Sequence, residues 1–552
     1  MESQRGLLFV ALLVVSYLLF NQWQMDNAPV QPQTEQVTTN SVPSSSAVND
    51  EFVPAGSDTK NTVNQSATAG GIITITSDVL ELKVDKQGGD IVSAKLLAYE
   101  TEQGSGKAMP IITQDGFTFV AQSGLIGNQG PDSSPAGRPI YATSAESFTL
   151  SDGAEQLVVE LSYINNDITY VKSFTLEQGK YNLTVAYNVI NNSASDANVQ
   201  LYAQLKQSIE IDDDSSMMMP TYRGAAYSTS ETRYEKYDFG DIEDANLNEA
   251  TKGGWVGMLQ HYFVTAWVPN KDNSNQLYTT YLANNGEAVI GFKAPLISVA
   301  PGTKQTTSAQ FYVGPKDQDK LEAIADGLDL TVDYGFLWMI SQPLFALLIF
   351  IQGIVVNWGI AIICITIVVK TLMFPLTKTQ YTSMAKMRKI QPKIAALKER
   401  HGDDRQKMSQ AMMELYKKEK VNPAGGCLPL LLQMPIFLAL YWVFMESVEL
   451  RHAEFGLWIT DLSSKDPFFV LPILMGASML LMQKLQPAMS QDPMQQKMMQ
   501  WMPVFFTFFF LWFPSGLVLY WFISNVITVI QMLIIFRGID KKEEKEKLAK
   551  SS

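Results

Sequence analysis

Hydrophobic and polar residues follow two different periods in two parts of the chain. Between residues 72 and 317, apolar positions recur at every second residue in short runs, as at Leu80, Leu82 and Val84. Gly, Asn and Asp separate these runs, for example the Gly pair at 88–89. A period of two is typical of strands with one buried face. Such strands with turn residues between them predict a large antiparallel β-sandwich.

Continuous apolar runs replace this alternation near residue 1 and beyond residue 335. A run at 6–20 follows Arg5 and predicts an uncleaved N-terminal anchor. Residues 336–350 predict a helix on the outer membrane surface. Several runs are shorter than the ~20 residues of a perpendicular spanning helix. We expect a mixed fold class, a six-span α-helical membrane bundle plus the β-sandwich, with the five later spans at about 355–374, 427–445, 468–482, 498–513 and 517–536.

Charge divides the chain in the same way. Residues 26–335 contain 39 acidic and 18 basic side chains, whereas the whole chain has a net charge of −13. The rest of the chain is therefore net basic, and the loop 378–420 alone holds 12 Lys and Arg residues. Basic loops stay on the cytoplasmic side of a membrane. We therefore expect both termini and this loop in the cytoplasm, and the sandwich outside.

The patterns also set segment boundaries. Residues 27–71 are rich in Ser, Thr, Gln and Asn and predict a disordered tether. The loop 378–420 is helix-prone with a break at residues 401–403, which predicts a helical hairpin. We expect eight segments: the anchor (1–26), the tether (27–71), the sandwich (72–332), the surface helix (333–350), the second span (351–377), the hairpin (378–423), the other four spans (424–536) and a basic tail (537–552).

One charged residue interrupts a predicted span. Lys370 follows the apolar run 360–369, and a charge within a span is costly and marks a functional site by default. The alternative is a lysine that extends to the headgroups. Thr366 lies four residues earlier on the same helix face, and Gln433, Ser524 and Asn525 add polarity to other spans. These residues predict a polar groove, or only hydrogen bonds that join helices.

Other chemistry finds little support in the sequence. We see no nucleophile–base pair, Walker motif or HExxH motif, so we do not expect an enzyme or a cofactor. The two cysteines form no metal-binding CxxC, and the three histidines are far apart in sequence, so no metal is expected. The acidic run 212–214 fits a solvated loop better than a cation or sugar site.

Several short motifs resemble the YidC membrane protein insertase family, in its Gram-negative form with a large periplasmic domain. The resemblance covers about residues 333–537. The motifs are Phe374-Pro375-Leu376-Thr377-Lys378, Asn422-Pro423-Ala424-Gly425-Gly426-Cys427, Gln433-Met434-Pro435, Asp492-Pro493-Met494 and Phe513-Pro514-Ser515-Gly516-Leu517.

The resemblance implies a function and a location. It implies a hydrophilic groove, open to the cytoplasm and to lipid, in which Lys370 replaces the family's usual Arg. Substrate helices would slide past Cys427, Met434, Phe505 and Tyr520. The implied partners are nascent membrane proteins, the ribosome, a Sec-type translocon and membrane lipids, with the protein acting as a monomer. The implied location is the bacterial inner membrane, and the implied outer subfold is a β-supersandwich similar to mutarotases.

Two other functions remain open at this point. An anion transporter or channel would use Lys370 as its ion site, although the internal repeats that favour a transporter are not visible. A sugar-binding outer domain on a passive membrane anchor is the other alternative. The hairpin is equally open, since its basic surface suits anionic lipid or ribosomal RNA but also serves topology alone.

Overall fold

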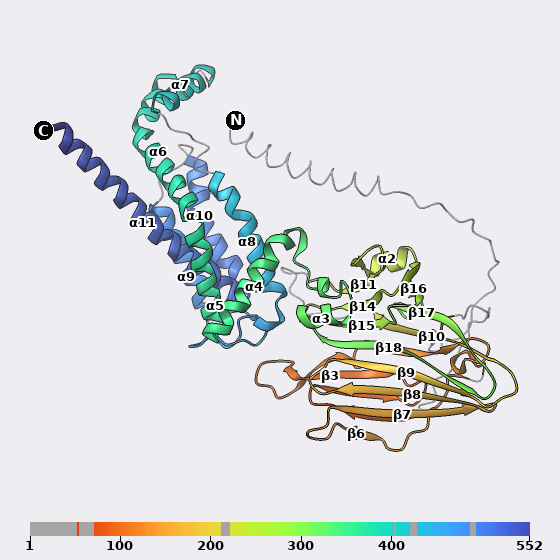
Figure 1. Cartoon of the computed structure of the whole chain (residues 1–552). Coiled ribbons are helices and arrows are strands. Elements are labelled where there is room, and N and C mark those ends of the chain that lie inside the picture. Colours follow the sequence, from red (N-terminus) through yellow and green to blue (C-terminus); the bar gives the residue numbers. More distant parts are fainter. Residues whose placement is uncertain are drawn as a thin grey trace.

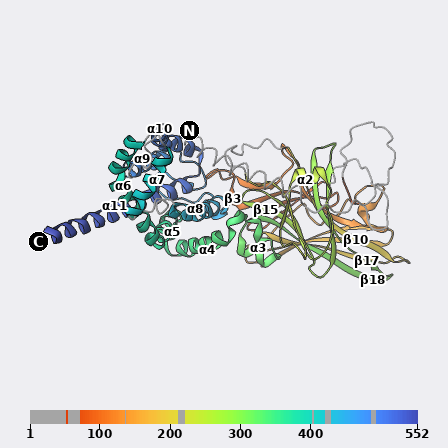
Figure 2. The ribbon, with the colours of Figure 1, turned by 90° about the horizontal axis from the view of Figure 1, so that it is seen from above.

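The chain folds into a β-sandwich beside a bundle of helices (Figure 1). The computed structural model describes residues 52–54, 71–135, 137–210, 221–401, 405–419, 428–485 and 493–551. The predicted anchor, nearly all of the tether, the acidic run 212–214 and Cys427 lie outside the described residues. Seen from above, the helices occupy one end of the molecule and the strands the other (Figure 2).

The first sheet has ten strands, in the order β13-β16-β17-β10-β5-β3-β2-β1-β6, with β4 paired to β3. Its pairings are antiparallel except that β1 and β6 run parallel. A long connection separates these two strands, so no hairpin fixes their direction. The strands are β1 Ile72–Thr76, β2 Leu80–Asp85, β3 Ile91–Glu100, β4 Ala108–Ile112, β5 Phe119–Ile126, β6 Ser147–Thr149, β10 Ala197–Ser208, β13 Asn248–Lys252, β16 Ser274–Leu282 and β17 Glu287–Val299.

The second sheet has eight antiparallel strands, in the order β12-β11-β14-β15-β18-β9-β8-β7. These are β7 Gln156–Asn165, β8 Ile168–Glu177, β9 Asn182–Asn191, β11 Gly224–Ser228, β12 Glu235–Tyr237, β14 Trp255–Leu259, β15 Phe263–Pro269 and β18 Thr303–Pro315. The short helices α2 (Phe239–Asp244) and α3 (Gln318–Ile324) complete the domain. The predicted sandwich is confirmed, with one parallel pairing that the sequence pattern did not indicate.

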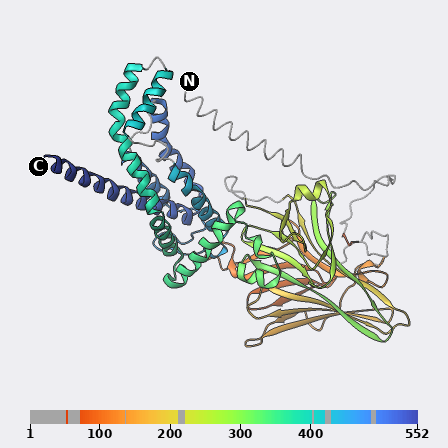
Figure 3. The ribbon, with the colours of Figure 1, turned by 45° about the horizontal axis from the view of Figure 1, so that its top comes forward.

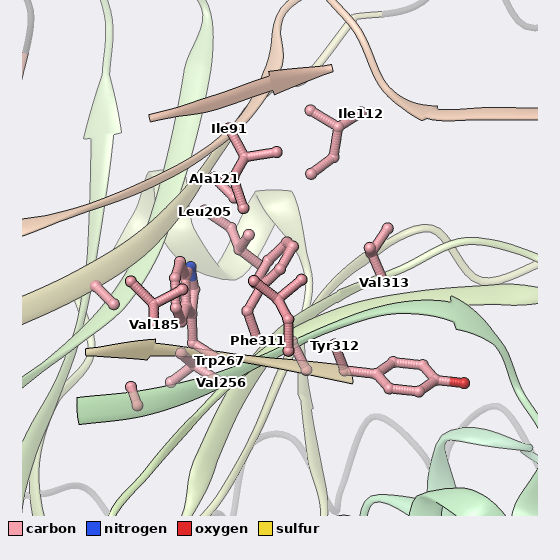
Figure 4. Close-up of a cluster of buried hydrophobic side chains, with 14 of the residues drawn as sticks. Ile91, Ile112, Ala121, Val185, Leu205, Val256, Trp267, Phe311, Tyr312 and Val313 are labelled. Atoms are coloured by element: carbon pink, nitrogen blue, oxygen red, sulfur yellow. The ribbon is translucent and has the colours of Figure 1, made fainter. Parts of the chain in front are cut away.

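The core of the sandwich lies between the two sheets (Figure 4). Ile91 and Leu205 come from the first sheet, and Trp267 and Phe311 from the second; all four are buried. The rings of Trp267 and Phe311 are 4.6 Å apart between centroids. The period-two residues Leu80, Leu82 and Val84 also point into this core. Alternation of apolar residues therefore located the buried face of these strands correctly.

The remaining chain is helical. Short 3-10 turns lie at Pro131–Ser133, Asp329–Thr331, Gly335–Leu337, Val448–Leu450 and Phe510–Trp512. The long helices are α4 Trp338–Val355, α5 Trp358–Leu372, α6 Phe374–His401, α7 Arg405–Lys418, α8 Leu428–Glu446, α9 Val470–Leu485, α10 Pro493–Phe509 and α11 Ser515–Ser551. Val356 adopts a left-handed conformation (φ 55°) that ends α4, and the Asn357 side chain then caps α5.

The number of spans stays a prediction. Among the described residues, two helices are long and apolar enough to cross a membrane, Gly335–Val355 and Ser515–Lys541. A third qualifies if Trp358–Leu372 and Phe374–Ile394, bent by 63°, count as one. Helices α9 and α10 have only 16 and 17 residues. The region predicted as a surface helix thus belongs to one of the two qualifying helices, and the first predicted span lies outside the described residues.

Helices α6 and α7 form an antiparallel hairpin at the end of the bundle that is farther from the sandwich (Figure 3). The break falls in the predicted region, since α6 ends at His401 and α7 begins at Arg405. The base of α6 packs on α11, where Tyr381 and Met384 meet Met532 and Ile535. Helix α11 itself continues through the predicted tail to Ser551.

Candidate functional site

Lys370 lies in the last turn of α5 and is buried, with 7% of its surface exposed. Its Nζ donates a hydrogen bond to Thr528 Oγ1 on α11, at 3.0 Å. Helices α5 and α11 pack against each other along the bundle. The lysine side chain is therefore directed towards the neighbouring helix.

Polar residues on α11 surround this lysine. The Thr528 hydroxyl donates to Ser524 O at 2.7 Å, and Gln531 Nε2 donates to Lys370 O at 2.9 Å. Ser524, Thr528 and Gln531 are four and three residues apart, so they share one helix face. Gln531 Oε1 is buried with no hydrogen-bond partner among the described residues. We call Lys370, Ser524, Thr528 and Gln531 the polar cluster.

The other residues predicted for a groove lie on three different helices. Thr366 is fully buried on α5, and its hydroxyl donates to Ile362 O of the same helix at 2.6 Å. Asn525 is buried and donates to Ser478 Oγ on α9 at 3.1 Å, so it joins two helices. Gln433 lies half-buried on α8. The structure therefore joins Lys370 to Thr528, one turn after Ser524, and directs Asn525 to α9.

Sequence reasoning missed Thr528, Gln531 and Ser478. The first two carried a detectable signal, because they follow Ser524 at the i+4 and i+7 positions of one helix face. The adjacent pair Ser524 and Asn525 gave the stronger signal, and of the two Asn525 hydrogen-bonds to α9. Ser478 carried no such signal, since a single serine in an apolar helix is common.

The four predicted substrate-contact residues differ in exposure. Met434 on α8 and Phe505 on α10 are exposed, at 47% and 65%. Tyr520 on α11 is buried, with the rings of Phe437 and Phe444 5.8 and 5.5 Å away between centroids. A substrate would reach Tyr520 only after α8 had moved. Cys427 lies outside the described residues.

Phe505 belongs to a continuous apolar stripe on α10 and the turn that follows it. Its members are exposed and recur every three or four residues, which places them on one helix face. We call this set the apolar stripe: Met498, Trp501, Phe505, Phe508 and Trp512. Such a surface suits lipid chains or an apolar helix of a partner.

The arrangement of the polar cluster suits binding rather than bond-breaking chemistry. A lysine ammonium has three donors, and the hydrogen bond found for it among the described residues goes to a neutral hydroxyl. Within the described part of the chain, no group of His, Cys, Asp and Glu residues is placed to hold a metal ion. A buried cation with an uncharged neighbour favours an anionic or strongly polar ligand.

Comparison with known proteins identifies the family. Residues 72–347 match the family model of the YidC periplasmic domain, and residues 350–543 match that of the 60Kd inner membrane protein. The chain is 54% identical over 548 residues to the membrane protein insertase YidC of Aeromonas hydrophila, covering 98% of this chain and 99% of the relative. It is 52% identical over 543 residues to that of Actinobacillus pleuropneumoniae, with the same coverage.

Solved structures give weaker matches. An active YidC insertase with its first transmembrane domain resolved is 18% identical, with a TM-score of 0.37, covering 83% of this chain and 90% of that one. A galactose mutarotase related enzyme from Lactobacillus acidophilus is 10% identical, with a TM-score of 0.30, covering 44% and 97%.

The two family models and the full-length relatives define an inner membrane protein that inserts other membrane proteins and carries a periplasmic domain. The chain belongs to the YidC family of membrane protein insertases. The sandwich is its periplasmic domain, and the relatives are named as insertases rather than as enzymes. Its substrates are therefore membrane proteins.

Proposed function

We propose that this insertase draws a short acidic segment of its substrate into the bundle at Lys370. The observation that carries the proposal is the buried lysine whose amine contacts only a hydroxyl among the described residues. A carboxylate leaving water loses much of its hydration energy. A nearby ammonium offsets part of that loss, and the interaction is strong because the surroundings are poorly hydrated.

The apolar part of the substrate would then pass along α8 and α10. Met434 and the apolar stripe offer exposed apolar side chains for this contact. Helices α5, α9 and α10 have 15, 16 and 17 residues. At 1.5 Å per residue they measure roughly 22–26 Å, less than the ~30 Å of a bilayer core. A thinner bilayer around these helices would lower the barrier to insertion.

The cytoplasmic hairpin would receive the substrate. Helices α6 and α7 carry many Lys and Arg residues, and one of them, Lys393, pairs with Glu419 at 2.6 Å to connect the hairpin. A basic surface of this kind attracts ribosomal RNA or anionic lipid. The proposed partners are the ribosome and a Sec-type translocon, and the protein would act as a monomer. It would cross the membrane six times, with both termini in the cytoplasm.

The charge of Lys370 is the feature to test. Insertion of a single-span substrate with an acidic outer segment is measured in vesicles carrying Lys370→Ala or Lys370→Arg. We expect the Ala variant to insert about tenfold less, because a hydrogen bond to a charged group is worth roughly 1.5–3 kcal/mol. The Arg variant keeps the charge and should retain most activity.

A matched control separates this site from general effects of charge. Lys484 is an exposed lysine in the last turn of α9, and Lys484→Ala removes the same charge elsewhere in the bundle. We expect normal insertion from this variant. Undiminished insertion by Lys370→Ala would remove the role that we give to the lysine. A substrate whose outer segment is neutral should be insensitive to Lys370→Ala.

A further inference from the structure

A cavity of about 300 Å³ lies where the periplasmic domain meets the helical bundle. The sandwich contributes Lys236 on β12 and Lys316 directly after β18, whereas α8 contributes residues of its last two turns. The residues that matter for its chemistry are Tyr234, Lys236, Lys316, Asp333, Trp442 and Glu446. None of them belongs to the polar cluster around Lys370, so this cavity is a separate site.

Two ion pairs line the cavity at different depths. The inner pair, Lys316 and Glu446, is almost fully buried, and its closest N–O distance is 3.9 Å, too long for a hydrogen bond. The outer pair, Lys236 and Asp333, is in direct contact and about one third exposed. The inner pair therefore leaves a buried ammonium and a buried carboxylate poorly hydrogen-bonded, while the outer pair marks the mouth.

Tyr234 adds a third underused polar group. Its hydroxyl oxygen is buried, and it has no hydrogen-bond partner among the described residues. The ring is held in place by stacking on Trp255, with 6.2 Å between centroids. Buried polar groups are nearly always hydrogen-bonded, and an unpaired one is costly. A hydroxyl, an ammonium and a carboxylate that all lack good partners indicate a polar ligand.

The position of the mouth indicates where this ligand comes from. Asp333 accepts a hydrogen bond from Gly335 N at 2.7 Å, which ties it to the start of α4. The next residues, Phe336, Trp338 and Met339, are 81%, 53% and 70% exposed. Trp and Tyr side chains are enriched at the headgroup level of membrane proteins, which is where Trp338 would lie. Trp442, on α8, also lines the cavity, and its residue type is again typical of the headgroup level.

We propose that this cavity binds the headgroup of an ethanolamine phospholipid from the outer leaflet. The phosphate would accept hydrogen bonds from Lys316 and Lys236, and the primary ammonium would donate to Glu446 and the Tyr234 oxygen. A zwitterion offers an acceptor to the two lysines and a donor to Glu446 without changing the net charge. A glycerol headgroup brings hydroxyl donors but no cation to offset the carboxylates, and a choline headgroup has no N–H to donate. The inference does not depend on the proposed role of Lys370.

Lipid binding to the full chain tests the proposal. Dioctanoyl phosphatidylethanolamine, phosphatidylcholine and phosphatidylglycerol are titrated into the detergent-solubilised protein, and bound lipid is counted by native mass spectrometry. We expect one saturable ethanolamine lipid and about tenfold weaker binding of the other two, because hydrogen bonds to charged groups are lost. Equal affinity for the three lipids would overturn the proposal.

Variants connect the binding to this cavity. The double variant Lys316→Met with Glu446→Gln removes the inner pair without leaving one charge alone, and we expect about tenfold weaker binding. The matched control is Lys95→Met with Glu81→Gln, a Lys–Glu pair at 3.0 Å on β2 and β3, which should bind normally. Tyr234→Phe keeps the ring and should weaken binding severalfold, even if the double variant does not fold. Unchanged binding by Tyr234→Phe and by a folded double variant would reject the site.

Soluble compounds distinguish the lipid from other sources of the same chemistry. Free phosphoethanolamine should compete, but more weakly than the lipid, because it has no acyl chains to bury beside Phe336 and Trp338. If free phosphoethanolamine bound as tightly as the lipid, the ligand of this cavity would be a soluble compound and not a lipid. If inorganic phosphate bound equally well, the cavity would be a simple anion site and the zwitterion would be wrong.

Discussion

The two parts of this protein each bury a lysine, and the two lysines differ in how fully their amines are hydrogen-bonded. Lys172 lies fully buried in the sandwich, and Lys370 lies buried in the helical bundle. Lys172 Nζ donates to the carbonyl oxygens of Gly88 and Ser123 at 3.1 and 3.0 Å. Lys370 Nζ donates to one hydroxyl among the described residues. The same side chain is therefore well satisfied in one environment and poorly satisfied in the other.

The surroundings of Lys172 complete this contrast. Its amine faces the rings of Phe174 and Tyr187, 5.5 and 5.2 Å from their centroids. Asp90 and Asp132 both pair with Arg138 beside it, so two carboxylates face two cations. A buried charge whose partners are all supplied by the fold has a structural role. A buried charge whose partners are missing is available to a ligand, and this is the reason to place function at Lys370.

The largest expected effect comes from removing the buried lysine of the sandwich. At about pH 6, where Lys172 is charged because its pKa is about 7, Lys172→Met leaves two buried carboxylates against one guanidinium, and removing one partner from a buried charge network costs roughly 3–5 kcal/mol. We expect amide hydrogens in β8 and β9 to exchange at least about a hundredfold faster, measured by mass spectrometry on the full chain. Lys370→Met should leave exchange in α5 and α11 unchanged or slower, because it removes a poorly paired charge.

One outcome would contradict the difference between the two lysines. If Lys370→Met loosened α5 and α11 as strongly as Lys172→Met loosens the sandwich, both lysines would be structural. The matched control for the sandwich is Lys95→Met, which removes a half-buried lysine paired with Glu81 from β3 and should change exchange little.

A smaller effect concerns pH. Burial lowers the pKa of Lys172 from its ordinary value of 10.5 to about 7, with Asp90 opposing this shift. Between these two values the unfolded lysine holds a proton that the folded one releases, so the stability of the sandwich rises with pH. This contribution is complete above 10.5 and is lost as pH falls to about 7. We expect up to about 1.4 kcal/mol per pH unit from this group.

Hydrogen exchange of β8 at pH 7.5 and 8.5, corrected for the intrinsic exchange rate, measures this slope. The same experiment on Lys95→Met should give the full slope, and that on Lys172→Met should lack it. A wild-type sandwich whose stability is flat or falls over this interval would show that Lys172 stays charged there, held by Asp90 and Asp132.

The sequence predicted the sandwich well because each strand has one buried face. Leu80, Leu82 and Val84 show this directly, since all three alternate with polar residues and all three are buried. The sequence pattern gives no sign that Lys172 is special, although it lies within such a strand. Its amine donates to the turn at 88–89 and to Ser123, and the carboxylates of Asp90 and Asp132 attract it; only the folded topology brings these groups together. No local pattern encodes such a set.

The helical part was predictable in other respects. Lys370 was visible because it interrupts an apolar run, and a polar residue stands out there. Boundaries were harder, since apolar composition alone does not separate a surface helix from a span. The left-handed Val356 and the Asn357 cap divide α4 from α5 instead. The cavity between Lys316 and Glu446 was beyond prediction, because it depends on how two domains meet.

The smallest expected effect comes from removing the hydroxyl that accepts the hydrogen bond of Lys370. Thr528→Val keeps the shape of the side chain but removes the hydroxyl that orients the Lys370 amine. The charge remains, so we expect insertion of an acidic substrate to fall only about two- to fivefold, in line with roughly 1 kcal/mol for one hydrogen bond. Thr507→Val is the matched control, because the Thr507 hydroxyl likewise donates to a carbonyl of its own helix, at 2.7 Å.

A double-mutant cycle decides whether Thr528 acts through the lysine. If it does, adding Thr528→Val to Lys370→Ala causes no further loss of insertion, because the hydroxyl no longer has an amine to orient. Independent losses that multiply would show that Thr528 contacts the substrate or supports α11 by itself. In that case the hydroxyl would be a separate part of the site.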